Sequence, residues 1–255
     1  MNTISSAVDR LSLIKSATTR MAGPIECFAR IKGLVFDLDG TLYSQEPVRR
    51  VMAWRIFRAH LFQPRQGIRT VRMLRAYRHA QEELRSAQVG GDPSKQQLRI
   101  AAQECNVQES DVELCVKYWS NQALDLLLPA LRPGVVEVLQ LARKKGMLLG
   151  VLSDYPAEAK LSAMALRDYF DVVVSAADPE VQRLKPDSRG LEVVLGRLGL
   201  EKHEAVYIGD RPLVDGFAAI SAGMPCAILA SSHYKPGPWL KIDNFDDIRQ
   251  ALLAH

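Results

Sequence analysis

The sequence has no pair of cysteines at the spacing of a metal site or a redox motif. No two of its five histidines stand at metal-ligand spacing, and no apolar run is long enough to span a membrane. These absences exclude a disulfide scaffold and a membrane span, and they predict a cytoplasmic globular protein with reduced thiols. The scattered cysteines are Cys27, Cys105, Cys115 and Cys226.

The first thirty residues lack the apolar core of a secretory signal and form a predicted N-terminal extension, 1–30. Ile4, Val8, Leu11 and Ile14 follow helical spacing, which predicts an amphipathic helix from Asn2 to about Met21. Residues 2–21 are rich in serine and threonine and hold a single acid, Asp9, a composition that faintly resembles a transit peptide. A leading helix is the favoured interpretation.

Residues 47–91 contain no lysine and few acids. The window holds ten arginines, and its only acids are Glu82 and Glu83. This window carries a charge of +8, although the whole chain carries only +4. A solvated helical face is one interpretation. A second is that Arg49, Arg50 and Arg55 bind an anionic substrate.

A third interpretation of the arginine-rich window is attachment to a membrane surface or to nucleic acid, because Trp54, Phe57 and Leu61 lie among the arginines. Nucleic acid is not expected, and membrane contact is the less favoured alternative. We interpret these three apolar side chains as the core of a helical bundle. The oligomeric state stays open.

Helical rhythm continues through the segment 45–131. Ile68, Val71, Leu74 and Tyr77 predict the inner face of a second helix, and Gly90–Pro93 predicts a break. A third helix is expected over Ser94–Glu104. Ser110 and Glu113 form a capping-box pattern before a fourth. The segment therefore predicts a bundle of about four helices.

Strands and helices alternate in the rest of the chain, in the segments 31–44 and 132–255. This order predicts an α/β fold: a Rossmann-like, three-layer core whose parallel sheet is covered by helices on both faces. Helices are expected up to about Tyr169, from Val214 to Ala222, and from Phe245 to Leu253. The predicted strands are Leu34–Phe36, Met147–Leu152, Val172–Val174, Ala205–Ile208 and Cys226–Leu229.

Polar side chains follow the predicted strands at the edge where ligands bind in parallel sheets. Asp37 and Asp39 follow the first strand on the same side of the chain. Acids at two strand ends could hold Mg²⁺, while a hydroxyl and an ammonium could hold phosphate oxygens. The converging residues are Asp37, Asp39, Ser153, Lys185, Asp210 and Asp215.

Four motifs in order resemble those of the haloacid dehalogenase superfamily, in its phosphatase branch. Asp37–Leu38–Asp39–Gly40–Thr41 matches the first motif and Ser153 the second, while Lys185–Pro186 matches the third and Gly209–Asp210 with Asp215 the fourth. The resemblance covers about Ile31 to Leu229. The family has a helical cap inserted between the first two motifs, and in this chain the segment 45–131 lies there.

The resemblance implies a Mg²⁺-dependent phosphatase acting on a small phosphomonoester. Asp37 would be the nucleophile that forms an aspartyl-phosphate, and Asp39 would transfer the protons. Mg²⁺ would bind the Asp37 carboxylate, the Asp39 carbonyl and Asp210, with Asp215 as a ligand or as the holder of a metal-bound water. The implied substrate and phosphate contacts are Thr41, Ser153, Asp154 and Lys185.

Asp39 favours phosphoryl transfer over dehalogenation, because the similar dehalogenases have no leaving alcohol to protonate and lack this second aspartate. Asp154 departs from the family pattern, which often has asparagine there. An acid at this position needs a substrate hydroxyl, an amine or a cap arginine to face. One alternative is a phosphomutase or another phosphoryl transferase of the same superfamily, and the other is a low-turnover binding or regulatory module that uses the basic cap.

Overall fold

A computed structural model describes residues 28, 31–230 and 234–254, so the helix expected over 2–21 lies outside the described residues. Six parallel strands form one sheet in the order β3-β2-β1-β4-β5-β6. The strands are β1 (Gly33–Phe36), β2 (Leu148–Ser153), β3 (Val172–Ser175), β4 (Ala205–Gly209), β5 (Cys226–Leu229) and β6 (Leu240–Ile242).

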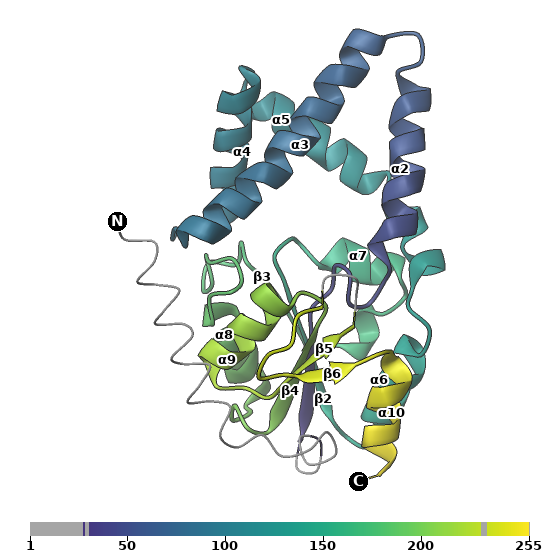
Figure 1. The fold of residues 1–255 in the computed structure, drawn as a ribbon, viewed down its shortest axis with the longest axis vertical. Coiled ribbons are helices and arrows are strands. Elements are labelled where there is room, and N and C mark those ends of the chain that lie inside the picture. The colour runs from purple at the N-terminus through teal and green to yellow at the C-terminus, as the bar shows by residue number, and fades with distance from the viewer. Residues whose placement is uncertain (1–27, 29–30, 231–233, 255) are drawn as a thin grey trace.

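Alternate side chains of the central strand β1 pack on opposite faces of the sheet, as a two-residue period requires. Leu34 and Phe36 join one apolar core, and Val35 joins the other. The first core is covered by α6 (Val135–Lys144), α7 (Glu158–Ala163) and α10 (Phe245–Leu253). The second is covered by α8 (Arg189–Leu198) and α9 (Phe217–Ala222). The predicted three-layer α/β fold is confirmed (Figure 1).

Four helices between β1 and β2 stand to one side of the sheet, and we call them the helical module (Figure 1). Met73, Ala76, Ala101 and Val112 belong to its own small core. The helices are α2 (Gln45–Ala59), α3 (Pro64–Ala87), α4 (Pro93–Cys105) and α5 (Glu109–Asn121). None of the described helices has the length and apolar composition of a membrane span.

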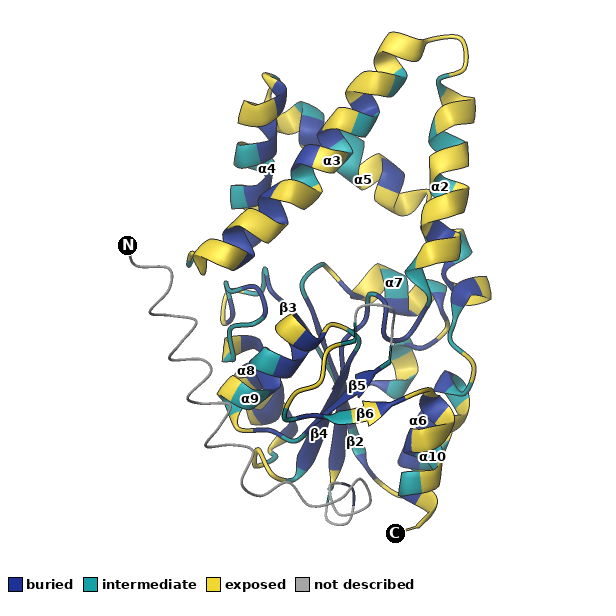
Figure 2. Cartoon of the chain, in the orientation of Figure 1, coloured by how far each residue is buried: buried dark blue, intermediate teal, exposed yellow. Residues whose placement is uncertain are grey.

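The predicted inner face of the first helix in the module is wrong, and that of the second is only partly right, because Tyr77 packs against the core of the module. Trp54 and Phe57 are exposed, because α2 turns a different stripe inward, on which Val48 is buried (Figure 2). Leu61 is exposed in the turn after α2. On α3 the buried stripe contains Met73, Ala76, Ala80 and Leu84, whereas Ile68 points to solvent. Small alanines allow close helix packing but give a weak hydrophobic signal. The larger apolar residues beside them were therefore assigned to the buried face.

Smaller corrections concern helix ends in the module and the core. No capping box forms at Ser110, because α5 already begins at Glu109. The helix expected up to Tyr169 stops at Ala163, and a π-helix over Pro212–Gly216 precedes α9. The short edge strand β6 was not predicted, whereas α10 has its predicted bounds.

Candidate active site

The carboxyl ends of β1 and β4 bring three acids together at the centre of the sheet. Carboxylate oxygens of Asp37, Asp210 and Asp215 all lie within 4.8 Å of one another. Gly40, with a φ of +105°, makes this approach feasible, because a β-carbon there would lie 2.4 Å from Asp210 Oδ2. The glycine of the first motif therefore makes room for an acid of the fourth.

Lys185 extends from the loop after β3 into this cluster, where its side chain is buried. Its Nζ donates to Asp37 Oδ1, to Asp215 Oδ1 at 2.7 Å and to the Tyr207 hydroxyl at 3.0 Å. Thr41 Oγ1 donates to the other oxygen of Asp37 at 2.9 Å. Both oxygens of Asp37 are thus oriented by donors of the protein.

Burial and the carboxylates of Asp215 and Asp210 raise the pKa of Asp37 well above its ordinary value, although Lys185 opposes this shift. Burial and Asp215 also raise the pKa of Asp210 to about 6. The pKa of Asp215 is lowered, since Lys185 and backbone amides more than offset its burial. Without a bound cation, Asp37 and Asp210 are therefore harder to ionise than an ordinary aspartate.

Asp210 Oδ1 is buried without a hydrogen-bond partner among the described residues, and a buried acceptor without a donor is costly. A hard divalent cation that prefers carboxylate oxygens would satisfy this atom and favour the ionised forms of Asp37 and Asp210. Asp215 differs, because its Oδ2 already accepts from the amides of Asp210 and Arg211, at 3.2 and 2.9 Å. The residues present fit such a cation.

Asp39 lies outside the acidic cluster and faces two residues that the sequence analysis missed. Its carboxylate is paired with Lys160 Nζ at 2.7 and 2.5 Å, and it accepts from the Tyr43 hydroxyl. Although burial opposes the effect, the Lys160 ammonium lowers the pKa of Asp39. Lys160 lies on α7, directly after the second motif, so its place on the first helix after that motif was a usable signal.

Ser153 ends β2 and is almost fully buried. Its Oγ accepts from the amide of Tyr155 at 3.2 Å, which leaves its own proton available to an anion. The structure thus brings Ser153, Lys185, Asp37, Asp39, Asp210 and Asp215 to the same edge of the sheet, as predicted from the motifs.

Asp154 faces an arginine of the helical module, one of the three partners that the sequence analysis required. Arg85 Nη2, at the end of α3, donates to Asp154 Oδ2 at 2.6 Å, and Arg85 Nε donates to the Lys185 carbonyl at 2.9 Å. Asp154 Oδ1 accepts from the Lys185 amide at 3.1 Å. This pair connects the module with the loops of the second and third motifs.

Two further contacts hold the end of α3 against the core. The Tyr155 hydroxyl donates to Gln81 Oε1 at 2.8 Å, and Leu84 packs against Ala176 and Leu184. Arg55, which one of the three interpretations made a substrate contact, is paired with Asp125 of its own segment. The contact of Arg85 with the core was not predicted. The sequence pattern does not distinguish a buried arginine from the solvated ones around it.

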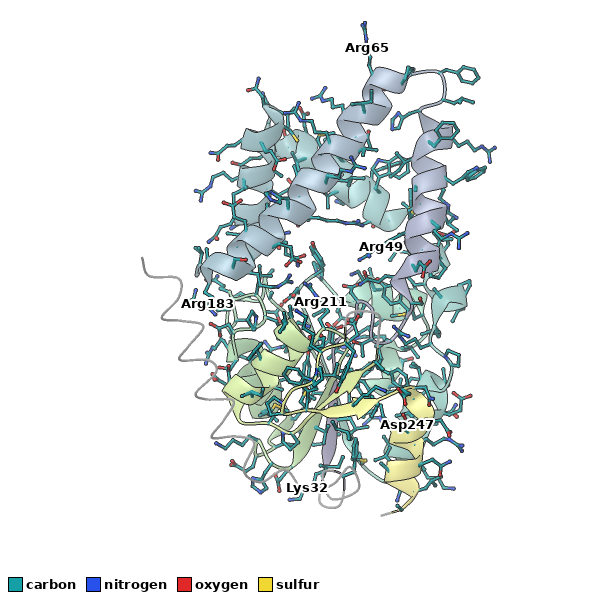
Figure 3. The ribbon with its side chains drawn as sticks, in the orientation of Figure 1. Lys32, Arg49, Arg65, Arg183, Arg211 and Asp247 are labelled. Carbon is teal, nitrogen blue, oxygen red and sulfur yellow. The ribbon has the colours of Figure 1, made fainter. Side chains whose placement is uncertain are left out.

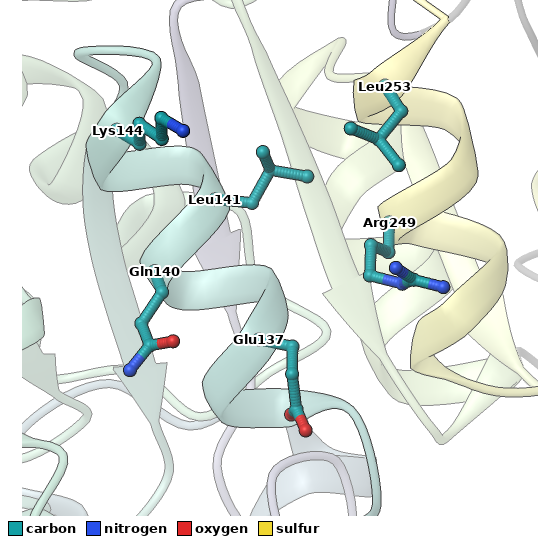
Figure 4. A pocket seen from close by; sticks show the side chains of 6 residues that line it. All are labelled: Glu137, Gln140, Leu141, Lys144, Arg249 and Leu253. Atoms are coloured by element: carbon teal, nitrogen blue, oxygen red, sulfur yellow. The ribbon is translucent and has the colours of Figure 1, made fainter.

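An open groove of about 270 Å³ lies between α6 and α10 (Figure 4). Its lining contains none of the residues that the motifs singled out, so we assign it no part in the chemistry. The lining residues are Glu137, Gln140, Leu141, Lys144, Arg249 and Leu253.

The chain is similar in sequence to bacterial phosphatases. The chain is 29% identical over 211 residues to a phosphoglycolate phosphatase of Yersinia pseudotuberculosis, covering 78% of this chain and 81% of that one. It is also 29% identical over 206 residues to the validoxylamine A 7'-phosphate phosphatase of Streptomyces hygroscopicus, covering 79% and 87%. Both relatives are phosphatases, the class of enzyme that the sequence predicted.

Solved structures show the same fold. The putative HAD-hydrolase YfnB of Bacillus subtilis, described as bound to magnesium, matches with a TM-score of 0.66 at 14% identity, covering 88% of this chain and 99% of that one. The family model of the haloacid dehalogenase-like hydrolases matches residues 31–223, which include all four motifs. The chain therefore belongs to the haloacid dehalogenase-like hydrolases.

Proposed function

We propose that this protein is a Mg²⁺-dependent phosphatase that hydrolyses a small phosphomonoester through an aspartyl-phosphate on Asp37. The observation that carries this proposal is the position of Asp37, which accepts from Lys185 and Thr41. Asp37 also lies beside Asp210, whose Oδ1 has no hydrogen-bond partner among the described residues. The names of the two phosphatase relatives support a phosphorylated small molecule as the substrate.

Mg²⁺ would be held by Asp37, the Asp39 carbonyl and Asp210, and would supply positive charge to the phosphoryl oxygens. Asp215 has protein donors on both oxygens, so its role is to orient Lys185 and the Asp210 loop. Lys185 and the Ser153 hydroxyl stabilise the negative charge of the transferring group, and such preorganised stabilisation is the main contribution in phosphoryl transfer.

In the first step, an Asp37 carboxylate oxygen forms a bond to phosphorus while the bond to the leaving alcohol breaks. Asp39 donates the proton to that alcohol, which requires Lys160 to move off the Asp39 carboxyl group as the leaving group enters. In the second step, Asp39 takes a proton from the water that cleaves the aspartyl-phosphate. The Lys160 contact, which lowers the pKa of Asp39, favours this base form.

We further propose that the helical module is the cap of this site, with residues 31–44 and 132–255 as the catalytic core. The Arg85 contact with Asp154 and Lys185 supports this arrangement. Residues of the module would then close over a bound substrate from the side of α3.

Hydrolysis of an aryl phosphate with and without Mg²⁺ tests the proposal. Asp37→Asn should abolish Mg²⁺-dependent release of phosphate, while Asp168→Asn, an exposed acid on the same domain, should leave it unchanged. Acid quenching of the wild type should trap a phosphate adduct on the peptide that contains Asp37. Full activity of Asp37→Asn would exclude Asp37 as the nucleophile. With a sugar phosphate as substrate, an isomerised sugar phosphate without free phosphate would indicate a mutase.

A further inference from the structure

Six large apolar side chains are exposed along one short segment of the helical module. They account for half of the exposed large hydrophobic residues among those that the structure describes. We call this segment, 51–68, the hairpin tip, because it holds the end of α2, the turn and the start of α3 (Figure 1). The six residues are Val51, Trp54, Phe57, Leu61, Phe62 and Ile68.

Three of these side chains share the outer face of α2 with arginines. Arg50, Val51, Trp54, Phe57 and Arg58 follow helical spacing on one face of α2, and every one of them is exposed. The guanidinium carbon of Arg58 lies 5.3 Å from the centre of the Trp54 ring. The outer face of α2 is therefore apolar and basic at once.

Arg55 and Arg69 pair with Asp125 and Asp111 of the module, whereas Arg58 and Arg65 have no ion pair among the described residues. Residues 47–81 contain nine arginines and no acid. Phe62, in the turn, is 93% exposed, and Arg65 projects from the end of the module that is farthest from the sheet (Figure 3). No described helix or strand lies beyond this end of the module, so the described part of the chain leaves it open to a flat surface (Figure 1).

We propose that the hairpin tip docks on an anionic lipid bilayer, with its aromatic and aliphatic side chains in the interface and its arginines on the headgroups. Charge complementarity favours this occupant, since anionic lipids attract basic segments that carry apolar side chains. A second copy of the chain would bring two positive tips together, which repel each other. Single-stranded nucleic acid would stack on rings, but Val51, Leu61 and Ile68 have none.

The chain contains its own reporter for this contact. Of its three tryptophans, Trp54 is 55% exposed, whereas Trp119 and Trp239 are only 8% and 7% exposed. Vesicles of phosphatidylcholine with about a third phosphatidylglycerol should shift the fluorescence of the full chain to shorter wavelength. Trp54→Phe should remove that shift but keep co-sedimentation with the vesicles. Phosphatidylcholine alone, or high salt, should strongly weaken binding.

Paired variants separate the two parts of the surface. Phe57→Ser with Phe62→Ser should lower the vesicle partition coefficient at least about tenfold through lost apolar burial. Arg58→Glu with Arg65→Glu should lower it about a hundredfold, because each basic residue near the surface counts separately. The matched controls are Leu114→Ser and Lys145→Glu, both exposed elsewhere, and they should bind like the wild type.

Thermal unfolding and hydrolysis of a soluble aryl phosphate check that each variant is folded, since none of these residues lies in the proposed catalytic machinery. Vesicle binding that the tip variants leave intact would overturn the proposal. So would a Trp54 shift that appears with protein concentration alone, which indicates self-association, or with RNA but not with vesicles.

Discussion

The ion pair between Arg85 and Asp154 is expected to couple the helical module to the catalytic loops. The Arg85 side chain is 7% exposed and that of Asp154 is 12% exposed, so both charges are largely removed from water. Three guanidinium nitrogens of Arg85 contact Asp154, Glu82 and the Lys185 carbonyl. Although burial opposes it, the Asp154 carboxylate raises the pKa of Arg85, which is therefore charged at every relevant pH.

Arg85→Met keeps the length of the aliphatic part of the side chain but leaves the Asp154 carboxylate and the Lys185 carbonyl without this donor. Removing one partner of a buried pair costs about 3–5 kcal/mol. We expect the lower end, about 3 kcal/mol, because Asp154 keeps the Lys185 amide as a donor at 3.1 Å. Asp154→Asn should cost less, because Arg85 keeps Glu82 as a charged partner.

A double-mutant cycle isolates the pair, with Arg85→Met and Asp154→Asn combined in one chain. The coupling energy should be about 1.5–3 kcal/mol, because the double variant buries no unpaired charge at this position. Urea unfolding followed by circular dichroism and by fluorescence gives the free energies, provided that the two transitions coincide. Arg75→Met, an exposed arginine on the same helix, should change stability by less than about 0.5 kcal/mol.

The value of kcat/KM for an aryl phosphate should fall in Arg85→Met, because the Lys185 carbonyl loses its contact with the module. A coupling energy below about 0.5 kcal/mol, which is the error of additivity, would refute the reasoning. It would mean that Asp154 and Arg85 are adjacent without holding the module in place.

Three further outcomes follow from the site. Gly40→Ala should displace Asp210 and raise the Mg²⁺ concentration for half-maximal activity at least about tenfold; an unchanged midpoint would contradict the crowding argument. Tyr207→Phe removes an acceptor of Lys185 and should lower the free energy of unfolding by about 1–3 kcal/mol in a urea titration. Burial raises the pKa of Glu82, but the two arginines beside it lower it to a net value below the ordinary one. The contribution of ionised Glu82 to the free energy of unfolding should therefore be present above its ordinary pKa and be lost as pH falls through its lowered pKa. Glu82→Gln should make the free energy of unfolding depend less on pH in urea titrations.

The sequence predicted the core well because buried strands and amphipathic helices carry strong apolar signals. The strands β1, β2 and β4 and the helix α10 lie where their patterns placed them, and the polar residues at the strand ends meet as the parallel topology requires. The edge strand β6 has only three residues and no apolar run, so its pairing with β5 depends on tertiary structure.

The site was predicted where a residue belongs to a motif and missed where it arrives from elsewhere. Lys160, Tyr207 and Arg85 each complete a charge or hydrogen bond of a motif residue, yet none of them stands at a motif position. Tyr207 lies inside an apolar strand. The strand pattern predicts that its ring is buried, but it does not predict that its hydroxyl contacts Lys185. The positions of Tyr207 and Arg85 next to their partners are fixed by packing geometry, which spacing along the chain does not encode.

The arginine-rich window also shows why charge counted along the chain differs from charge in space. Its residues lie along both arms of a helical hairpin, and α3 alone has 24 residues, which is about 36 Å of helix. Arg65, near one end of α3, is exposed, while Arg85, near the other end, is buried against Asp154. The screening length at physiological salt is about 8 Å, so the two ends of α3 act independently. An arginine at the hairpin tip is therefore too far away to act electrostatically on a substrate at the end of α3 that contacts the loops of the second and third motifs.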